Sequence, residues 1–372
     1  MKLRSISVVA LAAAASLVVA ACGSSSKTTT TTTGGGAATT TGSSSAPATI
    51  NGAGSTLAAP IYQQWGSNLK STGLTVNYNP VGSGTGIADL QTATVDFAGS
   101  DPSLKSTDTA KMKGPVLQFP VAFGAITVSY NLSGVKSGLR LDGPVLADIY
   151  LGKVKTWNDP AIKALNPSIS LPSTAITVVH RSDSSGTTKG FTTFLSDYSP
   201  TWKSQVGADK DVKWPTGTGA AKNSGVAAAV KQTDGAIGYV EQAYAIENNF
   251  TYASVKNSSG SYVLPTIANT SAAAIGIPVP ADLGISTINS PNASAYPIVS
   301  QTFLDVYTDP CKAGASQSVA GGLKKWLTYA LGDGQKTLGP NSNQLPYAPL
   351  PPAIDSKATA QLSSLVCNGT AL

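Results

Sequence analysis

The chain has little charge and few of the side chains that most often carry chemistry. Only 12% of its 372 residues are charged, one is histidine (His180) and three are cysteine. One imidazole and three scattered thiols cannot build a His/Cys metal site or a Cys/His dyad. The chain also lacks a nucleotide-binding Gly-x-x-x-x-Gly-Lys-Ser/Thr loop and a Gly-x-Ser-x-Gly elbow. We therefore expect no metal, no cofactor and no enzymatic activity.

The charge balance is only mildly basic. There are 25 Lys and Arg residues against 19 Asp and Glu residues, a formal charge of +6. Two of the basic residues, Lys2 and Arg4, lie in a segment that we expect to be removed, which leaves 23 against 19, or +4. Because no cluster of basic residues occurs, nucleic acid is not an expected partner.

The N-terminal segment is typical of an exported protein. An uncharged apolar stretch from Ile6 to Val19 is too short to span a bilayer and leads to small residues and Cys22. We interpret residues 1–21 as a lipoprotein signal peptide, because Val19-Ala20-Ala21-Cys22 resembles a bacterial lipobox with Cys22 as the lipidated residue. An ordinary signal peptide with an incidental cysteine is the alternative. Residues 22–48, almost only Ser, Thr, Gly and Ala, predict a flexible tether at the outer face of the cell membrane.

The two other cysteines form an even pair in an exported chain. A disulfide between Cys311 and Cys367 is therefore expected.

The rest of the chain predicts an α/β fold large enough for roughly two domains. Short β-rich runs, at 75–78, 125–130, 176–179 and 236–240, alternate with helical patterns. The helical patterns have apolar residues at Leu57, Ile61, Trp65 and Leu69, at Phe191, Phe194, Leu195 and Tyr198, and at Leu323, Trp326, Leu327 and Leu331. These stripes predict helix faces that pack on the core.

Three Gly/Ser/Thr segments each follow a predicted strand and lead into a predicted helix. They span residues 52–56, 82–86 and 183–187. The first turn of a helix leaves N–H groups without intrahelical partners, and the helix dipole favours a negative charge there. One such turn is an ordinary helix start, but three of them, one preceded by Arg181, indicate an anion site. Asp183 is placed to hold the guanidinium of Arg181.

At these segments the chain resembles a known family, the substrate-binding phosphate-binding proteins of phosphate ABC transporters, whose members are periplasmic proteins or lipoproteins. The resemblance extends from about Asn51 to the C-terminus and is weakest in the last quarter. It rests on residues 52–56, 95–101, 118–120, 148–153, 156–159, 181–187 and 235–241.

The resemblance implies a two-lobed periplasmic-binding-protein fold of type II, with two hinge strands and a ligand cleft between the lobes. The first lobe would combine residues 49–122 with 297–372, and the second would be 123–296. The disulfide would then lie within the first lobe.

The resemblance also implies a set of phosphate ligands: Thr56, Leu57, Ser83, Asp101, Arg181, Ser185, Gly186 and Thr187. Hydroxyls and backbone N–H groups would donate to phosphate, and Arg181, restrained by Asp183, would pair with its charge. Asp101 would accept a hydrogen bond, which protonated phosphate can give and sulfate cannot. From the residues alone, a turn or helix cap before Pro102 is the favoured role of Asp101, and only the resemblance reverses this order.

We expect high-affinity extracytoplasmic binding of inorganic phosphate and its delivery to the membrane permease and ATPase subunits of an ABC transporter. The alternatives are a secreted phosphate sensor or surface adhesin and, less favoured, a phosphatase. A phosphatase would need a nucleophile and base pair or a metal site that the sequence does not offer.

Overall fold

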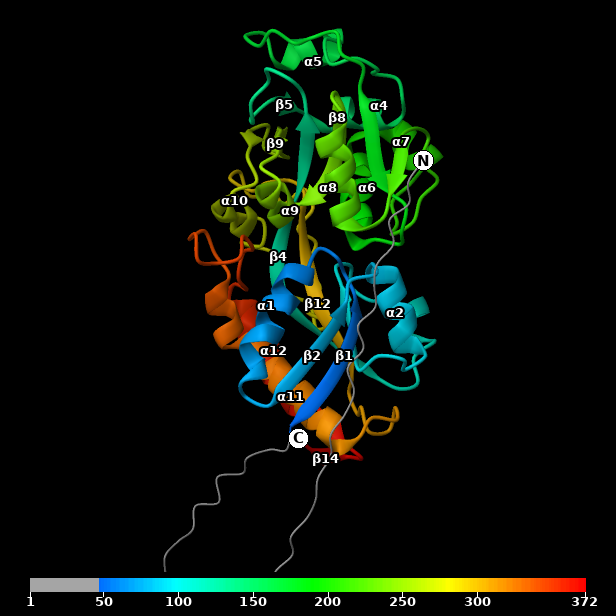
Figure 1. Cartoon of the computed structure of the whole chain (residues 1–372), viewed down its shortest axis with the longest axis vertical. Helices are drawn as coiled ribbons and strands as arrows, with labels where there is room; N and C mark the ends of the chain where they lie inside the picture. Colours follow the sequence, from blue (N-terminus) through cyan, green and yellow to red (C-terminus); the bar gives the residue numbers. More distant parts are fainter. Residues whose placement is uncertain (1–46) are drawn as a thin grey trace, which may run out of the picture. The chain divides into compact units, whose positions relative to one another are not determined.

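The computed structural model describes residues 47–372, so the predicted signal peptide and Cys22 lie outside the described residues. The fold is built on one nine-stranded mixed sheet with the strand order β2-β1-β3-β12-β4-β8-β6-β7, and β9 pairs with β4 (Figure 1). Its strands are β1 (Ala48–Gly54), β2 (Leu74–Asn79), β3 (Phe97–Ser100), β4 (Val116–Asn131), β6 (Thr177–Arg181), β7 (Thr218–Ala220), β8 (Ala236–Glu241), β9 (Thr251–Tyr252) and β12 (Val299–Tyr307).

Two small sheets complete the β structure. One has the order β11-β10-β5 and the other pairs β13 with β14. Their strands are β5 (Arg140–Leu141), β10 (Ser254–Lys256), β11 (Tyr262–Val263), β13 (Val366–Cys367) and β14 (Thr370–Ala371).

Helices connect and cover these strands. They are α1 (Ala59–Lys70), α2 (Ser83–Gln91), α3 (Ser106–Thr109), α4 (Gly143–Tyr150), α5 (Pro160–Leu165), α6 (Gly186–Tyr198), α7 (Pro200–Gln205), α8 (Lys222–Gln232), α9 (Gln242–Glu247), α10 (Ile267–Ala272), α11 (Gln317–Leu331) and α12 (Pro352–Gln361), with the 3-10 helices η1 (Asp333–Thr337) and η2 (Leu362–Ser364). Within residues 47–372, no helix combines the length and apolar character needed to cross a membrane.

The long strand β4 divides the main sheet into two halves. Its residues Val116 to Ala125 pair with β12, whereas Ile126 to Asn131 pair with β8. We call β1, β2, β3, β12 and the start of β4, with the helices packed on them, the first half, and β6 to β9 and the end of β4, with their helices, the second half. In Figure 1, α1 and α2 from the start of the chain lie in the same half as α11 and α12 from its end.

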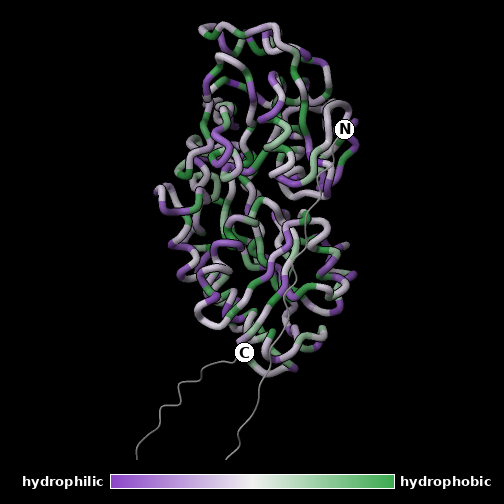
Figure 2. Tube along the Cα trace, in the orientation of Figure 1, coloured by the Kyte–Doolittle hydropathy of each residue, from purple (hydrophilic) through white to green (hydrophobic). Residues whose placement is uncertain are grey.

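The predicted apolar stripes lie in the cores of both halves. In the first half, α1 buries Ile61, Trp65 and Leu69, and Trp65 and Trp326 of α11 meet edge to face with their ring centroids 5.9 Å apart. Burying each of these large rings stabilises the fold by on the order of 2–3 kcal/mol. Figure 2 shows how the hydrophobic residues follow the central strands.

In the second half, the corresponding core contact is between α6 and β8. Phe191 of α6 stacks on Tyr239 of β8, with the centroids 4.4 Å apart. The predicted α/β class, with a mixed sheet and helical cover, is confirmed.

The expected disulfide is present. Cys311 and Cys367 are bonded, with their Cα atoms 5.0 Å apart, and they connect the chain after β12 to β13.

The start of the first helix was predicted wrongly. Residues 52–54 do not form a turn but continue strand β1, and α1 begins only at Ala59. The glycines serve close strand packing, because a Cβ at Gly52 would overlap the ring of Phe97 and one at Gly54 would overlap the Gly99 carbonyl of β3. Pro60, the second residue of α1, favours the helix start there, since its ring is preorganised for the first turn. The predicted tether also ends earlier, because β1 already includes Ala48.

Candidate functional site

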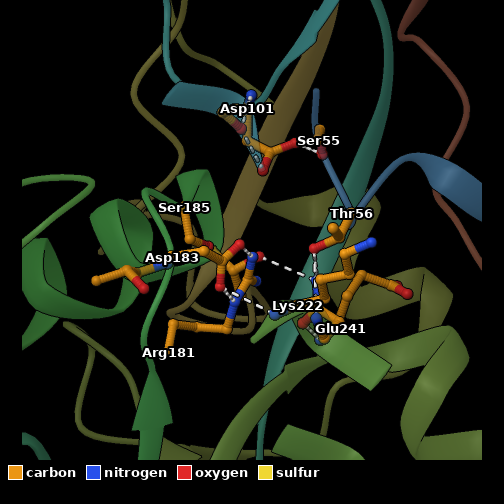
Figure 3. Close-up of polar contacts among 12 residues, drawn as sticks. Ser55, Thr56, Asp101, Arg181, Asp183, Ser185, Lys222 and Glu241 are labelled. Atoms are coloured by element: carbon orange, nitrogen blue, oxygen red, sulfur yellow. Dashed lines mark hydrogen bonds and ion pairs between the residues drawn. The ribbon is translucent and has the colours of Figure 1, made fainter. Parts of the chain in front are cut away.

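The candidate site lies where segments that follow β1, β3 and β6 come together (Figure 3). The predicted ligands come from both halves of the sheet, and each is buried: Thr56, Leu57, Ser83, Asp101, Arg181, Ser185, Gly186 and Thr187. Asp183 is half-buried. The halves are in direct contact here, because the Gly84 N–H donates to the Ser184 carbonyl at 3.1 Å.

Arg181, at the end of β6, supplies the positive charge of the site. Its side chain is 0% exposed, and its Nε and Nη2 donate to the two Asp183 carboxylate oxygens at 2.7 and 2.5 Å. Burial alone would raise the pKa of Asp183, but the hydrogen bonds and charge of Arg181, with an N–H from Lys222, outweigh it and lower the pKa. Asp183 therefore stays ionised and fixes the plane of the guanidinium.

One nitrogen of this guanidinium remains without a partner. Among residues 47–372, the buried Nη1 of Arg181 has no hydrogen-bond partner. A buried charged donor without an acceptor is costly, on the order of 1–3 kcal/mol or more. An oxyanion at this position would satisfy it.

Asp101 follows β3 and is surrounded by hydroxyl groups. Its Oδ1 accepts from Ser55 at 2.5 Å and from Thr302 of β12 at 3.0 Å, and its Oδ2 accepts from Ser83 at 3.2 Å. Burial raises the pKa of Asp101, and these hydrogen bonds and the charge of Arg181 only partly offset that effect. A carboxylate held by donors on one side is a strong acceptor for a further O–H.

Backbone N–H groups add donors of the kind that bind oxyanions. Helix α6 begins at Gly186, with Ser185 as its N-cap, whose Oγ accepts from the Thr188 N–H at 3.2 Å. The N–H groups of Gly186 and Thr187, in the first turn, have no intrahelical acceptor. Within the described part of the chain, the N–H groups of Thr56 and Leu57 also lack a backbone acceptor.

The structure thus brings all predicted ligands into one buried region, with one difference in detail. The Ser83 hydroxyl, expected to point at a ligand, donates to the Asp101 carboxylate and accepts from the Asp101 N–H at 3.3 Å. Helix α2 starts at Ser83, which places this hydroxyl next to Asp101.

Several residues of the region were not singled out from the sequence. These are Ser55, Thr302, Lys222, Asn223, Glu241, Tyr244 and Tyr347. Ser55 and Glu241 belong to segments that carry the family resemblance, so they could have been found. The others are brought in by tertiary contacts from distant parts of the chain.

The single histidine does not contribute to the site. His180 stacks on Trp214, with the ring centroids 4.6 Å apart, and burial lowers its pKa. Among residues 47–372, no three His, Cys, Asp or Glu side chains are grouped so that they could hold a metal ion.

Comparison with known proteins agrees with this fold. A family model described as a PBP superfamily domain matches residues 30–333. The match covers most of the chain, so the chain belongs to the PBP superfamily, and its mixed α/β fold agrees with that membership.

Two relatives define the family more closely. The phosphate-binding protein PstS of Xylella fastidiosa is 39% identical over 319 residues, 85% of each chain. The phosphate-binding protein PstS of Pasteurella multocida is 40% identical over 317 residues, 84% of this chain and 89% of the relative. The chain belongs to the family of PstS phosphate-binding proteins.

A solved structure shows the same fold. This structure is of a high affinity periplasmic phosphate-binding protein bound with phosphate. The two sequences are 26% identical, the TM-score is 0.64, and the match covers 84% of this chain and 93% of the other.

Proposed function

We propose that the protein binds inorganic phosphate outside the cytoplasm and delivers it to the permease and ATPase subunits of a phosphate ABC transporter. Its family relatives are named phosphate-binding proteins, and its site has the chemistry that such an anion needs. A carrier of this kind releases its ligand unchanged, so no catalytic group is required.

The observation that carries the proposal is the buried Nη1 of Arg181. The guanidinium is held on one side by Asp183, and Nη1 has no acceptor among the described residues. Arg presents a planar fork that suits phosphate, and a neutral ligand would leave this charge unbalanced. The ligand that completes the site is therefore an oxyanion.

Asp101 selects which oxyanion binds. Phosphate at neutral pH retains at least one proton, so its O–H group can donate a hydrogen bond to the Asp101 carboxylate, whereas sulfate has no O–H group. Sulfate would place an unprotonated oxygen beside a buried like charge, at a cost of several kcal/mol. The site thus favours phosphate over sulfate.

The other ligands are donors from both halves. In the proposal, Thr56 and Leu57 use their N–H groups, Ser185, Gly186 and Thr187 bind at the first turn of α6, and the hydroxyls of Thr56, Ser185 and Thr187 complete the shell. The Ser83 hydroxyl donates to Asp101 and so supports the site through that carboxylate. This is the arrangement expected for tight binding of a fully dehydrated anion.

The two halves act as lobes that close on the ligand. We assign 49–122 and 297–372 to the first lobe and 123–296 to the second, close to the point where β4 changes its partner strand. Contacts that span the halves include the Tyr244 hydroxyl donating to the Thr56 carbonyl at 2.9 Å and the Lys105–Asp209 ion pair at 3.1 Å. In the proposal these contacts form as the lobes close and break when phosphate is released.

The N-terminal segment serves as the membrane attachment. In the proposal the signal peptide of residues 1–21 is removed, Cys22 carries lipid, and the Ser/Thr-rich segment spaces the binding protein from the outer face of the membrane. Mass spectrometry of the mature N-terminus tests this: an unmodified mature N-terminus at any other residue would contradict it.

Titration calorimetry of the mature binding domain tests the main proposal. Phosphate should bind with one site per chain, and sulfate should fail to compete at a large excess. Absence of phosphate binding, or equal binding of sulfate, would refute the proposed function.

A further inference from the structure

We propose that Asn223 is a positioning residue that holds the hydroxyl groups of Thr56 and Thr187 as hydrogen-bond donors to bound phosphate. This inference rests on the proposed function and names a residue that acts through two ligands.

Asn223 lies between the two lobes at the start of α8. Its side chain is 0% exposed, and its Nδ2 donates to Thr56 Oγ1 at 2.9 Å and to Thr187 Oγ1 at 3.3 Å. Thr56 comes from the first half of the sheet and Thr187 from the second, so one amide contacts a proposed ligand hydroxyl of each half.

The third contact of Asn223 fixes which end of its amide faces the threonines. Its Oδ1 accepts from the backbone N–H of Glu241 at 3.0 Å. A backbone N–H can only donate, so the atom that faces it must be the amide oxygen. The NH2 group therefore faces Thr56 and Thr187, and the reversed amide would leave two donors facing each other.

The orientation of the amide determines what the hydroxyls can do. A hydroxyl that accepts a hydrogen bond from the NH2 group keeps its own hydrogen available for another acceptor. Within residues 47–372, neither Thr56 Oγ1 nor Thr187 Oγ1 donates to a protein acceptor. Both hydrogens are thus free for the oxygens of phosphate, an anion that accepts far more hydrogen bonds than it donates.

The backbone next to Asn223 is held in an unusual conformation. Lys222 has φ 67°, in the left-handed region that residues other than glycine rarely adopt. In this conformation its N–H donates to Asp183 Oδ1 at 2.9 Å (Figure 3). At the start of α8, Lys222 therefore contacts Asp183, the partner of Arg181, and the next residue, Asn223, contacts the two threonine hydroxyls. The strained backbone at Lys222 thus has a role in the site.

The first test is the phosphate affinity of two variants of the full folded domain. Asn223→Ala should weaken phosphate binding by about 10- to 100-fold, because both hydroxyls lose the side-chain donor that orients them and Thr56 keeps only the longer 3.4 Å bond from the Asn223 backbone N–H. Asn223→Asp has the same shape but can only accept, so the threonine hydroxyls would turn toward it and away from phosphate. Its added negative charge also opposes the anion, so it should bind more weakly than the alanine variant.

A matched control separates positioning from a general loss of stability. Asn166 is also a buried asparagine with three hydrogen bonds, from the Arg140 N–H and to the Arg140 and Ile162 carbonyls, and none of these partners is in the site. Asn166→Ala should lower the melting temperature of the ligand-free protein to an extent similar to Asn223→Ala but leave the phosphate dissociation constant unchanged.

The decisive measurement is a double-mutant cycle. In a Thr56→Val, Thr187→Val background, there are no hydroxyls to orient, so Asn223→Ala should change the dissociation constant by less than about threefold. A merely structural role would give the same loss as in the wild-type background, and that result would overturn the inference.

The failure of this inference is distinguishable from that of the proposed function. If wild type binds phosphate and Asn223→Ala binds it as tightly, only the inference fails. If wild type binds no phosphate, the proposed function fails and the inference fails with it.

Discussion

At the scale of single residues, the candidate site depends on a few buried polar groups, because hydrogen bonds and charges act more strongly away from water. Asp101 is the clearest example, because it is 4% exposed and its two carboxylate oxygens accept from three hydroxyls. In the proposal, the remaining acceptor capacity of this carboxylate is filled by a hydrogen bond from an O–H group of the ligand. In the proposed function, selectivity between oxyanions is thus decided by a single hydrogen.

Changing Asp101 to asparagine should relax that selectivity. The amide of Asp101→Asn can donate and is uncharged, so sulfate should gain at least about tenfold in affinity relative to phosphate. Competition calorimetry with both anions gives the ratio. An unchanged ratio would show that Asp101 does not discriminate.

Gly186 is a position where the two halves of the sheet come into close contact. It lies in the first turn of α6, and a Cβ there would overlap the carboxylate of Asp101, which belongs to the other half of the sheet. Gly186→Ala should therefore prevent full closure and weaken phosphate binding by at least about tenfold, because the two lobes could no longer meet.

The control for Gly186 is a helical glycine with open space around it. Gly321 of α11 has no atom within 4 Å of an added Cβ. Gly321→Ala should stabilise the protein by about 0.5–1 kcal/mol and leave phosphate affinity unchanged. Equal affinity of wild type and Gly186→Ala would contradict the close approach of the lobes.

At the scale of elements, strand β12 carries an ionisable group that the site does not use. Asp305 is 0% exposed, and neither of its carboxylate oxygens has a partner among the described residues. Burial raises the pKa of Asp305 well above its usual value, Lys210 opposes the effect, and Asp108 and Asp101 add to it. The carboxyl group is thus expected to keep its proton above the pH at which an exposed aspartate loses it.

The sign of the pH dependence follows from this raised pKa. The folded state holds a proton that the unfolded chain releases near pH 4. The stabilising contribution is therefore complete below about pH 4 and is lost as the pH rises through the folded-state pKa. Glu241, also fully buried with a raised pKa, contributes in the same direction.

Asp305→Asn should remove its share of this pH dependence. The variant has no proton to lose, so its free energy of unfolding should fall less between pH 5 and pH 8 and exceed that of wild type at the upper end by about 1–3 kcal/mol. Urea unfolding across this range gives the curves. Asp211→Asn, at an exposed position, is the control and should keep the wild-type slope. A wild-type slope in Asp305→Asn would show that the carboxyl group does not titrate as inferred.

The starts of two helices show where a local sequence pattern predicts an element boundary correctly and where it does not. Helix α6 begins within the predicted segment, because Ser185 caps it and Gly186 and Thr187 follow. The prediction for residues 52–56 was wrong in its boundary, because Gly52 and Gly54 are required by the neighbouring strand β3 and not by a turn. A local pattern cannot distinguish a glycine that bends the chain from one that makes room for another strand.

At the scale of the whole molecule, a disulfide ties the C-terminal strand β13 to the chain that follows β12 of the first half. The Cys311–Cys367 disulfide closes a loop with a sequence separation of 56 residues near the C-terminus. In the chain-entropy model, a loop of this length stabilises the folded state by about 4 kcal/mol.

Replacing both cysteines should separate stability from binding. Cys311→Ser with Cys367→Ser should lower the free energy of unfolding by about 4 kcal/mol in guanidinium chloride, while the phosphate dissociation constant stays the same, because neither cysteine is among the ligands. Reduced wild-type protein is the matched comparison and should behave like the double variant. A loss of phosphate affinity with stability retained would show that the disulfide acts on the site instead.

The sequence by itself determined the chemistry of the binding groups and much of the local structure. The apolar stripes around Trp65, Phe191 and Trp326 predicted core helices, and the segment from Arg181 to Thr187 predicted an anion site at a helix start, since periodicity and end groups are properties of neighbouring residues. Only the tertiary structure decided that Asn223, Thr302 and Tyr347 approach these groups, and that Asp101 meets Gly186 across the two halves. Such contacts join residues far apart in the chain, and they depend on how β4 and β12 pair, which no local pattern encodes.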